Sequence, residues 1–331
     1  MTLARQIIPG SIYLITRRCS ERRYFLAPNP AVKQLFGYLL GAQIEAHGLE
    51  LLAAVQMSNH YHIVVHDVRG KLPDFMRDFH GLIARSVNRL RKRVDAFWDA
   101  RQPAVTELCD PESVMKMLVY LACNPVEAGL VRDGRDWPGI RTSAFAATER
   151  PQRFTRPAGF FCDDSALPPD AALRIVLPPT HKHLNPRDFT AEVHERVRQR
   201  ELEIAAAFVA EGRVFGRVRD LLRIRWNDAP ESDDGRFELS PRVVAVDGTR
   251  RIGILSRVRL FVASYRRARA QYCSGMRDTV FPGGTWAVVR FLGLDVHAPP
   301  RLADLAQRTN RRTSLLRGPS TTARTVCAHW S

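Results

Sequence analysis

The order of strand-like and helix-like segments in the first 145 residues constrains the fold of this chain most strongly. Segments in which apolar and polar residues alternate predict strands, and segments whose apolar residues recur every three or four positions predict helices. The expected strands are 11–18, 49–56, 60–67 and about 103–108, and the expected helices are 31–47, 72–93 and about 111–123. This β-α-β-β-α-β-α order predicts an α+β fold, in which helices flank an antiparallel sheet.

Local signals mark the expected helix ends. Pro73 suits the first turn of the helix 72–93, because backbone N–H groups in the first turn have no acceptor within the helix. Asp110 is a natural N-cap for the next helix, with Pro111 at its first position. Asn124-Pro125 predicts the end of that helix, because a proline disfavours helical geometry in the residue before it.

The rest of the chain has weaker signals. Prolines recur between 151 and 179, which is typical of a linker, and charged helical patterns follow. The tail is rich in Arg, Ser and Thr, a composition that predicts disorder. We therefore predict a first domain over 1–148, a Pro-rich linker over 149–186, a helical basic accessory domain over 187–300 and a basic disordered tail over 301–331.

Charge points to a polyanionic partner. The chain has 50 Lys and Arg against 34 Asp and Glu, a formal net charge of +16, which favours nucleic acid. It has no apolar run long enough to cross a bilayer, and its first residues lack a signal-peptide core, so we expect a cytoplasmic protein without membrane contact. The six cysteines include no C-x-x-C pair, which argues against a zinc cluster.

The segment 57–66, MSNHYHIVVH, carries the chemistry. Side chains alternate between faces along a strand, so His60 and His62 share a face and lie roughly 6–7 Å apart. Two imidazoles at that separation can converge on one divalent ion. His66 shares the face but lies about 13 Å from His62, which makes it a poor third ligand unless the strand bends. The alternative is that both histidines are simply satisfied by hydrogen bonds on a half-buried strand.

Three blocks carry a resemblance to a known family. They are Gly10–Arg18, Met57–Val65, in which Ser58 replaces a usual Pro, and Tyr120–Val131 followed by Trp137-Pro138, with the aromatic pair Phe97-Trp98 between the last two. In this order, over about 10–143, they resemble the HUH superfamily of single-strand DNA nickases and transposases. The resemblance is to the insertion-sequence-200-like domain of REP-associated tyrosine transposases, and it covers under half of the chain.

This resemblance implies a ferredoxin- or RRM-like sheet whose histidine pair holds Mg²⁺ or Mn²⁺ beside a scissile DNA phosphate. In such enzymes a helical tyrosine attacks the phosphate and leaves a 5′-phosphotyrosine link and a free 3′-OH. A polar ligand follows one turn later, in a Y-x-x-x-N or Y-x-x-x-Q pattern. We expect the helix 72–93 to be the equivalent helix, which makes Asn88 the third ligand and places Ala84 where the nucleophile should be.

An alanine at that position leaves three explanations open. The domain is a catalytically inactive DNA-binding derivative, or Tyr265 or Tyr272 supplies the nucleophile, or the reaction uses His80, Ser86 or a water molecule. A further alternative is an RNA-binding protein that reuses the RRM-like sheet.

The expected phosphate contacts lie at the ends of two elements. They are Arg17 and Arg18 on the first strand, and Arg85, Arg89, Arg91, Lys92 and Arg93 on the helix 72–93. The resemblance implies single-stranded or hairpin DNA as the partner, and a homodimer is an open alternative. Arginines near 213–225 and 257–269 predict accessory DNA binding or dimer support.

Overall fold

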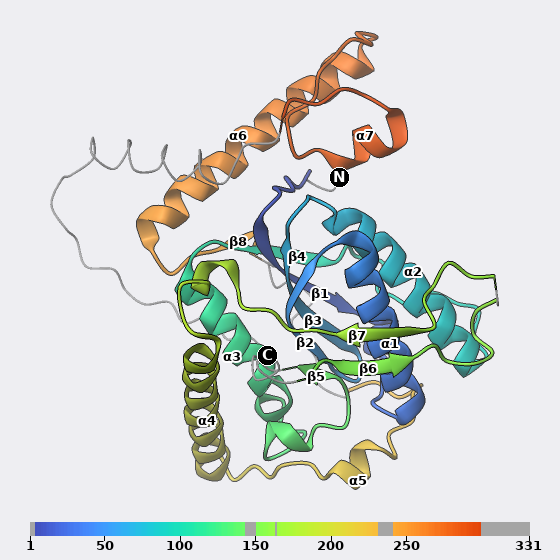
Figure 1. Cartoon of the computed structure of the whole chain (residues 1–331), viewed down its shortest axis with the longest axis vertical. Helices are drawn as coiled ribbons and strands as arrows, with labels where there is room; N and C mark the ends of the chain where they lie inside the picture. Colours follow the sequence, from blue (N-terminus) through green and yellow to red (C-terminus); the bar gives the residue numbers. More distant parts are fainter. Residues whose placement is uncertain (1–3, 143–149, 163, 231–240, 299–331) are drawn as a thin grey trace, which may run out of the picture.

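A six-stranded sheet lies at the centre of the molecule (Figure 1). The computed structural model describes residues 4–142, 150–162, 164–230 and 241–298. In spatial order the strands are β5 (Arg141–Thr142), β2 (Glu50–Gln56), β3 (His60–Asp67), β1 (Ser11–Arg18), β4 (Ala104–Leu108) and β8 (Val243–Val244). Neighbouring strands are antiparallel except β4 and β8. The predicted α+β class is confirmed.

The pairing of β1 with β3 sets the surroundings of the histidines. Thr16 lies opposite His62, and Arg18 lies opposite His60. Directly opposite residues on antiparallel strands project to the same face, so these four side chains gather on one face at one end of the sheet.

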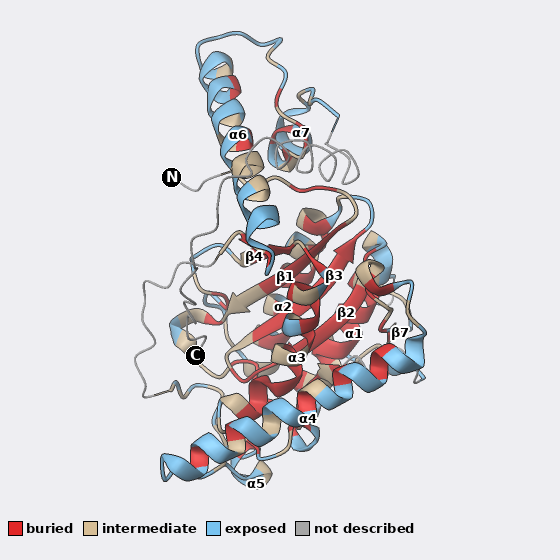
Figure 2. Cartoon of the chain, turned by 90° about the vertical axis from the view of Figure 1, so that its left-hand side faces the viewer, coloured by how far each residue is buried: buried red, intermediate tan, exposed pale blue. Residues whose placement is uncertain are grey.

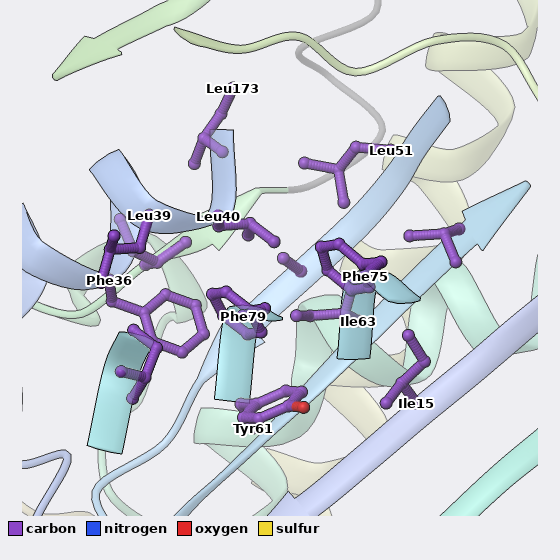
Figure 3. Close-up of a cluster of buried hydrophobic side chains, with 14 of the residues drawn as sticks. Ile15, Phe36, Leu39, Leu40, Leu51, Tyr61, Ile63, Phe75, Phe79 and Leu173 are labelled. Carbon is purple, nitrogen blue, oxygen red and sulfur yellow. The ribbon is translucent and has the colours of Figure 1, made fainter. Parts of the chain in front are cut away.

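Helices cover both faces of the sheet. The helices α1 (Pro30–His47) and α2 (Leu72–Arg91) pack on one face, and α3 (Pro111–Glu127) and α4 (Pro186–Ala210) on the other. Tyr61 and Ile63 point from β3 towards Phe75 and Phe79 of α2 (Figure 3). Because side chains alternate, His60 and His62 point to the opposite face, which α3 covers.

One of the two expected ends of α3 is confirmed, and the other is not. Asp110 does cap α3, since its carboxylate accepts from Ser113 N at 2.6 Å. However, the helix does not end at Asn124-Pro125 and continues to Glu127. A proline this near the C-terminal end forfeits one backbone bond, while Ala128 N still donates to Asn124 O at 3.0 Å. The expected stop at Asn124 was therefore wrong.

The Pro-rich stretch 149–186 is structured where it is described. It contains the hairpin of β6 (Gln152–Thr155) and β7 (Asp170–Leu173), which packs on α1. Phe154 and Leu173 are buried in the same core as Tyr61. A Cβ at Gly37 of α1 would lie 2.4 Å from the Phe154 ring, so only glycine allows this approach. The prolines shape a covering hairpin and do not form a spacer between two bodies.

The expected accessory region divides in two. Its first helix, α4, buries Phe189 and Val193 against the α3 side of the sheet and so belongs to the main body. After the short α5 (Val218–Leu221), the chain returns through β8 to a long helix, α6 (Gly248–Cys273), and to α7 (Trp286–Leu292). These last helices project from the edge of the sheet, and most of α6 is exposed (Figures 1 and 2). The predicted tail 301–331 lies outside the described residues.

None of the helices in the described ranges combines the length and apolar character that a membrane crossing requires.

Candidate metal and nucleic-acid site

The histidine pair lies at the start of β3, on the face that α3 covers. The ring centroids of His60 and His62 are 4.9 Å apart, and the rings are nearly perpendicular at 82°. His62 is 8% exposed, and His60 is half-buried. The predicted shared face is therefore confirmed, and the rings are closer than the strand rise alone implied.

Each ring is held through its Nδ1 atom. His62 Nδ1 lies 2.7 Å from Thr16 Oγ1, and His60 Nδ1 lies 2.6 Å from Asn59 Oδ1. The Asn59 amide is itself oriented, because its Nδ2 donates to Arg22 O at 3.1 Å. An Nδ1–H that donates to an oxygen leaves a lone pair on Nε2, which is the atom that a metal ligand offers.

Burial keeps both imidazoles neutral. Desolvation lowers the pKa of His62 to about 3, with Arg18 adding to the effect. Desolvation, and then the charges of His62 and Arg18, holds the pKa of His60 well below its ordinary value. Neutral imidazole is the form that binds metal ions, so the pair is ready to ligate near neutral pH.

Tyr120 of α3 faces this pair. Its ring centroid is 5.5 Å from that of His62, in an edge-on arrangement at 74°. The side chain is half-buried, so one part packs and another stays accessible. The capped start and the helical geometry of α3 fix this position. A tyrosine is thus present beside the histidines, on a helix other than the one expected.

Asn124 lies one turn after Tyr120, and residues four apart share a helix face. Its side chain is 8% exposed, and its Oδ1 is buried without a hydrogen-bond partner. An orphaned buried carbonyl costs about 1–3 kcal/mol, which a bound ion or water would offset. Among the described residues no three His, Cys, Asp or Glu side chains form a metal-holding group, so the ligands on offer here are two imidazoles and this amide.

The residues expected on the helix 72–93 lie across the sheet from the histidines. Ala84 is half-buried and packs against the core on the α2 side of the sheet, and Ser86 is buried in α2. The Asn88 side chain donates to Asp95 O at 2.8 Å and accepts from Arg93 at 3.1 Å. Its amide is therefore used in hydrogen bonds to the segment that follows α2. The strand separates these residues from His60 and His62. The structure therefore does not assemble the predicted ligand set His60, His62 and Asn88.

His80 also has a structural role on that far face. Its Nε2 forms a short hydrogen bond with Tyr61 Oη, and Trp98 donates to its carbonyl at 3.0 Å. Desolvation holds the pKa of His80 well below its ordinary value. His80 is thus a buried neutral partner of Tyr61, away from the pair.

The expected phosphate contacts are also split between the two faces. Arg18 lies with His60, and its charge acts on both histidines. Arg17 points the other way, with its guanidinium 5.1 Å from the Trp98 ring centroid. Arg93 packs 3.8 Å from the Phe25 ring centroid, and Arg91 lies 5.9 Å from that of Trp226. Arg85 and Arg89 are exposed on α2, and Lys92 is exposed directly after its end.

The residues that the sequence-based prediction missed are Tyr120 and Asn124. Their signal is present in the third block, where Tyr120-Leu121-Ala122-Cys123-Asn124 is itself a Y-x-x-x-N pattern. The prediction places the pattern on the helix 72–93, whereas the helix that covers the histidine face is α3.

Comparisons with known proteins give little further information. No family model matches the chain, and no curated protein matches it. Among solved structures, a REP-associated tyrosine transposase bound to a REP hairpin is similar at a TM-score of 0.36 and 17% sequence identity. The match covers 42% of this chain and 81% of that one. A similarity at this level assigns neither a family nor an activity to this chain.

Proposed function

We propose that this protein is a transposase-like enzyme that cleaves and rejoins single-stranded DNA, with Tyr120 as its nucleophile. The observation that carries the proposal is the position of Tyr120, whose ring lies 5.5 Å from His62 on the histidine face of the sheet. The resemblance of the three sequence blocks supports the same reaction class. The missing tyrosine at position 84 therefore does not count against catalysis.

His60, His62 and Asn124 would hold the divalent cation. Their fit rests on two Nδ1-anchored neutral imidazoles and on the buried, unpartnered Asn124 Oδ1. Two nitrogen ligands with one amide oxygen suit Mn²⁺ at least as well as Mg²⁺, which prefers oxygen. When bound, the cation supplies positive charge against the negative charge that develops on the phosphoryl oxygens.

Tyr120 would act by covalent catalysis. Its Oη forms a bond to phosphorus, and the bond from phosphorus to the 3′-oxygen of the preceding nucleotide breaks. The phenol loses one proton and the leaving 3′-oxygen gains one, so the step is balanced. The phosphotyrosine link keeps the phosphodiester energy, which allows the 3′-OH to rejoin a strand. Arg18, beside His60, adds a fixed positive charge for the phosphate.

The polarity of cleavage gives a sharp test. A hairpin with a single-stranded flank is labelled at its 5′ end or at its 3′ end and incubated with Mn²⁺. The 3′ label should become covalently attached to the protein on a denaturing gel, whereas the 5′ label should be released as a shorter strand. Mass spectrometry should place the adduct on the peptide that contains Tyr120, and EDTA should prevent its formation.

Other outcomes would favour the alternatives. Salt-sensitive DNA binding without cleavage would indicate an inactive DNA-binding derivative. Tighter binding of RNA than of DNA of the same sequence would favour an RNA-binding protein. An adduct on Tyr265 or Tyr272 would place the nucleophile in the C-terminal helices.

Thr16→Val should weaken metal binding without removing a ligand. The hydroxyl of Thr16 holds His62 Nδ1 at 2.7 Å, and loss of such an anchor typically lowers metal affinity about 10- to 100-fold. Calorimetric titration with Mn²⁺ measures the change. Thr106→Val is the matched control, because Thr106 is a buried threonine on β4 whose hydroxyl binds Pro241 O instead. Equal Mn²⁺ affinity in both variants would contradict the anchoring role of Thr16.

A further inference from the structure

The helix α6 differs in charge from every other long helix of the chain. It contains seven arginines and no Asp, Glu or Lys over 26 residues. The helix α4 is of similar length, with four arginines and five acids. Arg196, Arg198 and Arg200 of α4 each form ion pairs with glutamates. Three of the four arginines of α4 are thus paired with acids within the fold.

Most arginines of α6 have no such partner. Phe261 and Ala268 mark its buried stripe. Arg259, Arg266, Arg267 and Arg269 are exposed, and none has an ion-pair partner among the described residues. Arg266 and Arg269 are three apart, a spacing at which like charges repel. Within the part of the chain that the structure describes, this face carries uncompensated positive charge.

One further α6 arginine, Arg257, fixes the helix to the body. Arg257 pairs with Glu107 of β4, and both side chains are largely buried, at 13% and 8% exposure. The preceding backbone is held as well, because Asp110 accepts from Val246 N at 2.6 Å. Farther along, Trp286 donates to Asp74 of α2 at 3.1 Å. The segment 248–292, which we call the arm, is therefore held at two points and presents its arginines on a rigid support.

We propose that the arm binds the phosphate backbone of double-stranded DNA, such as the stem beside a single-stranded cleavage site. A helix of 26 residues is about 39 Å long, close to one turn of duplex. The exposed arginines of α6 are held along a straight helix, and the phosphates of a duplex are likewise held along a straight axis. Single-strand binding uses exposed aromatic rings for base stacking. The aromatic residues of α6 instead pack inward, with Tyr265 and Tyr272 against Phe281.

The arm starts where α3 starts. Asp110 caps α3 and also holds the backbone that leads into α6. Tyr120 lies ten residues further along α3, which is about 15 Å. A stem on the arm would thus lie within reach of a strand at the histidine face. In this respect the inference rests on the proposed function, although the binding itself does not require cleavage.

The test compares two triple variants of the full chain. Arg266, Arg267 and Arg269 are changed to Gln in one, and Arg196, Arg198 and Arg200 are changed to Gln in the other. Each variant loses three positive charges from one helix. Fluorescence anisotropy in EDTA measures the affinity for a hairpin with a 25-base-pair stem and for an unstructured strand, over a range of salt concentrations. Circular dichroism verifies that both variants fold.

The arm variant should bind the hairpin about 100-fold more weakly at about 0.15 M salt. The slope of log K against log salt should fall by about 2.7, because three phosphate contacts are lost. Its affinity for the unstructured strand should change less than threefold, and the α4 variant should change less than threefold on both probes. Changing the three arm arginines to Lys should preserve hairpin binding, since the contact is one of charge.

Equal losses in both variants would overturn the arm proposal, because net charge alone would then explain them. So would an unchanged hairpin affinity in the arm variant, or a shift from dimer to monomer in sedimentation, which would make the arm an interface between two copies. Cleavage is measured separately. If the wild type binds the stem but forms no adduct, the proposed function fails and the arm proposal stands.

Discussion

Tyr120→Phe should abolish formation of the covalent DNA adduct, with a loss of at least about 10³-fold in cleavage rate. The substitution removes only the hydroxyl that would attack phosphorus. The phenyl ring keeps its edge-on contact with His62, 5.5 Å away, so the fold and the histidine pair should be retained. DNA affinity should stay within about threefold of wild type, because the phosphate contacts come from other residues. The 3′-label gel and anisotropy measure the two quantities on the same substrate.

Tyr265→Phe and Tyr272→Phe are the controls for this result. Both tyrosines belong to α6 and pack against Phe281, away from the sheet. Their substitution should leave the cleavage rate unchanged. Full activity of Tyr120→Phe, or loss of the adduct in either control, would contradict the assignment of the nucleophile.

A second comparison concerns the position that the sequence suggested. Ala84→Tyr should produce no cleavage in the Tyr120→Phe background, because position 84 lies on α2, which covers the opposite face of the sheet. A tyrosine hydroxyl at position 84 would be separated from His62 by the sheet. Recovery of cleavage would show that α2, and not α3, is the catalytic helix.

The second large effect is a loss of stability in mild acid. Burial lowers the pKa of His62 to about 3 and holds that of His80 well below its ordinary value. Both are neutral in the folded protein, whereas the unfolded chain binds protons at a pKa of about 6.5. The unfolded state then holds more protons as the pH falls below 6.5. The stabilising contribution of these two neutral histidines is therefore complete above pH 6.5 and is lost as the pH falls below it.

His62 alone should remove about 2 kcal/mol of unfolding free energy between pH 7 and pH 5, and His80 adds a loss in the same direction. A loss of this size is a substantial part of the 5–15 kcal/mol that is typical of a domain. Urea unfolding at several pH values, in metal-free buffer, measures the dependence. His80→Gln can still bind Tyr61 Oη but cannot titrate, so its free energy should depend on pH less steeply, by about one proton. The same reduction is expected for His62→Asn. A variant with the same pH slope as wild type would exclude that histidine as a source of the acid sensitivity.

Much of the sheet and of the histidine pair was predictable from the sequence. Alternation over 60–67 defines the strand and places His60 and His62 on one side, because that periodicity is a property of the extended backbone itself. The helix 72–91 and its neighbour's cap at Asp110 also follow from local sequence. The partners of the Nδ1 atoms were not predictable, since Thr16 reaches His62 only through the pairing of β1 with β3.

The packing of the hairpin on α1, and that of α4 on the sheet, could not be predicted from the sequence either. Prolines between 151 and 179 indicate that the segment is irregular, but they do not indicate whether it packs. That depends on whether Phe154 and Leu173 find a complementary surface, which Gly37 of α1 provides at close range. Burial of this kind joins residues more than a hundred positions apart, so no local pattern reveals it.

By itself, the sequence determined which segments are strands and helices, which residues share a face of each, and that two histidines and a Y-x-x-x-N pattern are present. Only the tertiary structure decided which helix covers which face. Both α2 and α3 have an apolar side that can pack on a sheet, and a helical period does not state which side of the sheet it will meet. The packing of α2 against Tyr61 and Ile63 leaves the histidine face to α3. That choice brings Tyr120 beside His62 and leaves Ala84 on the opposite side of the sheet.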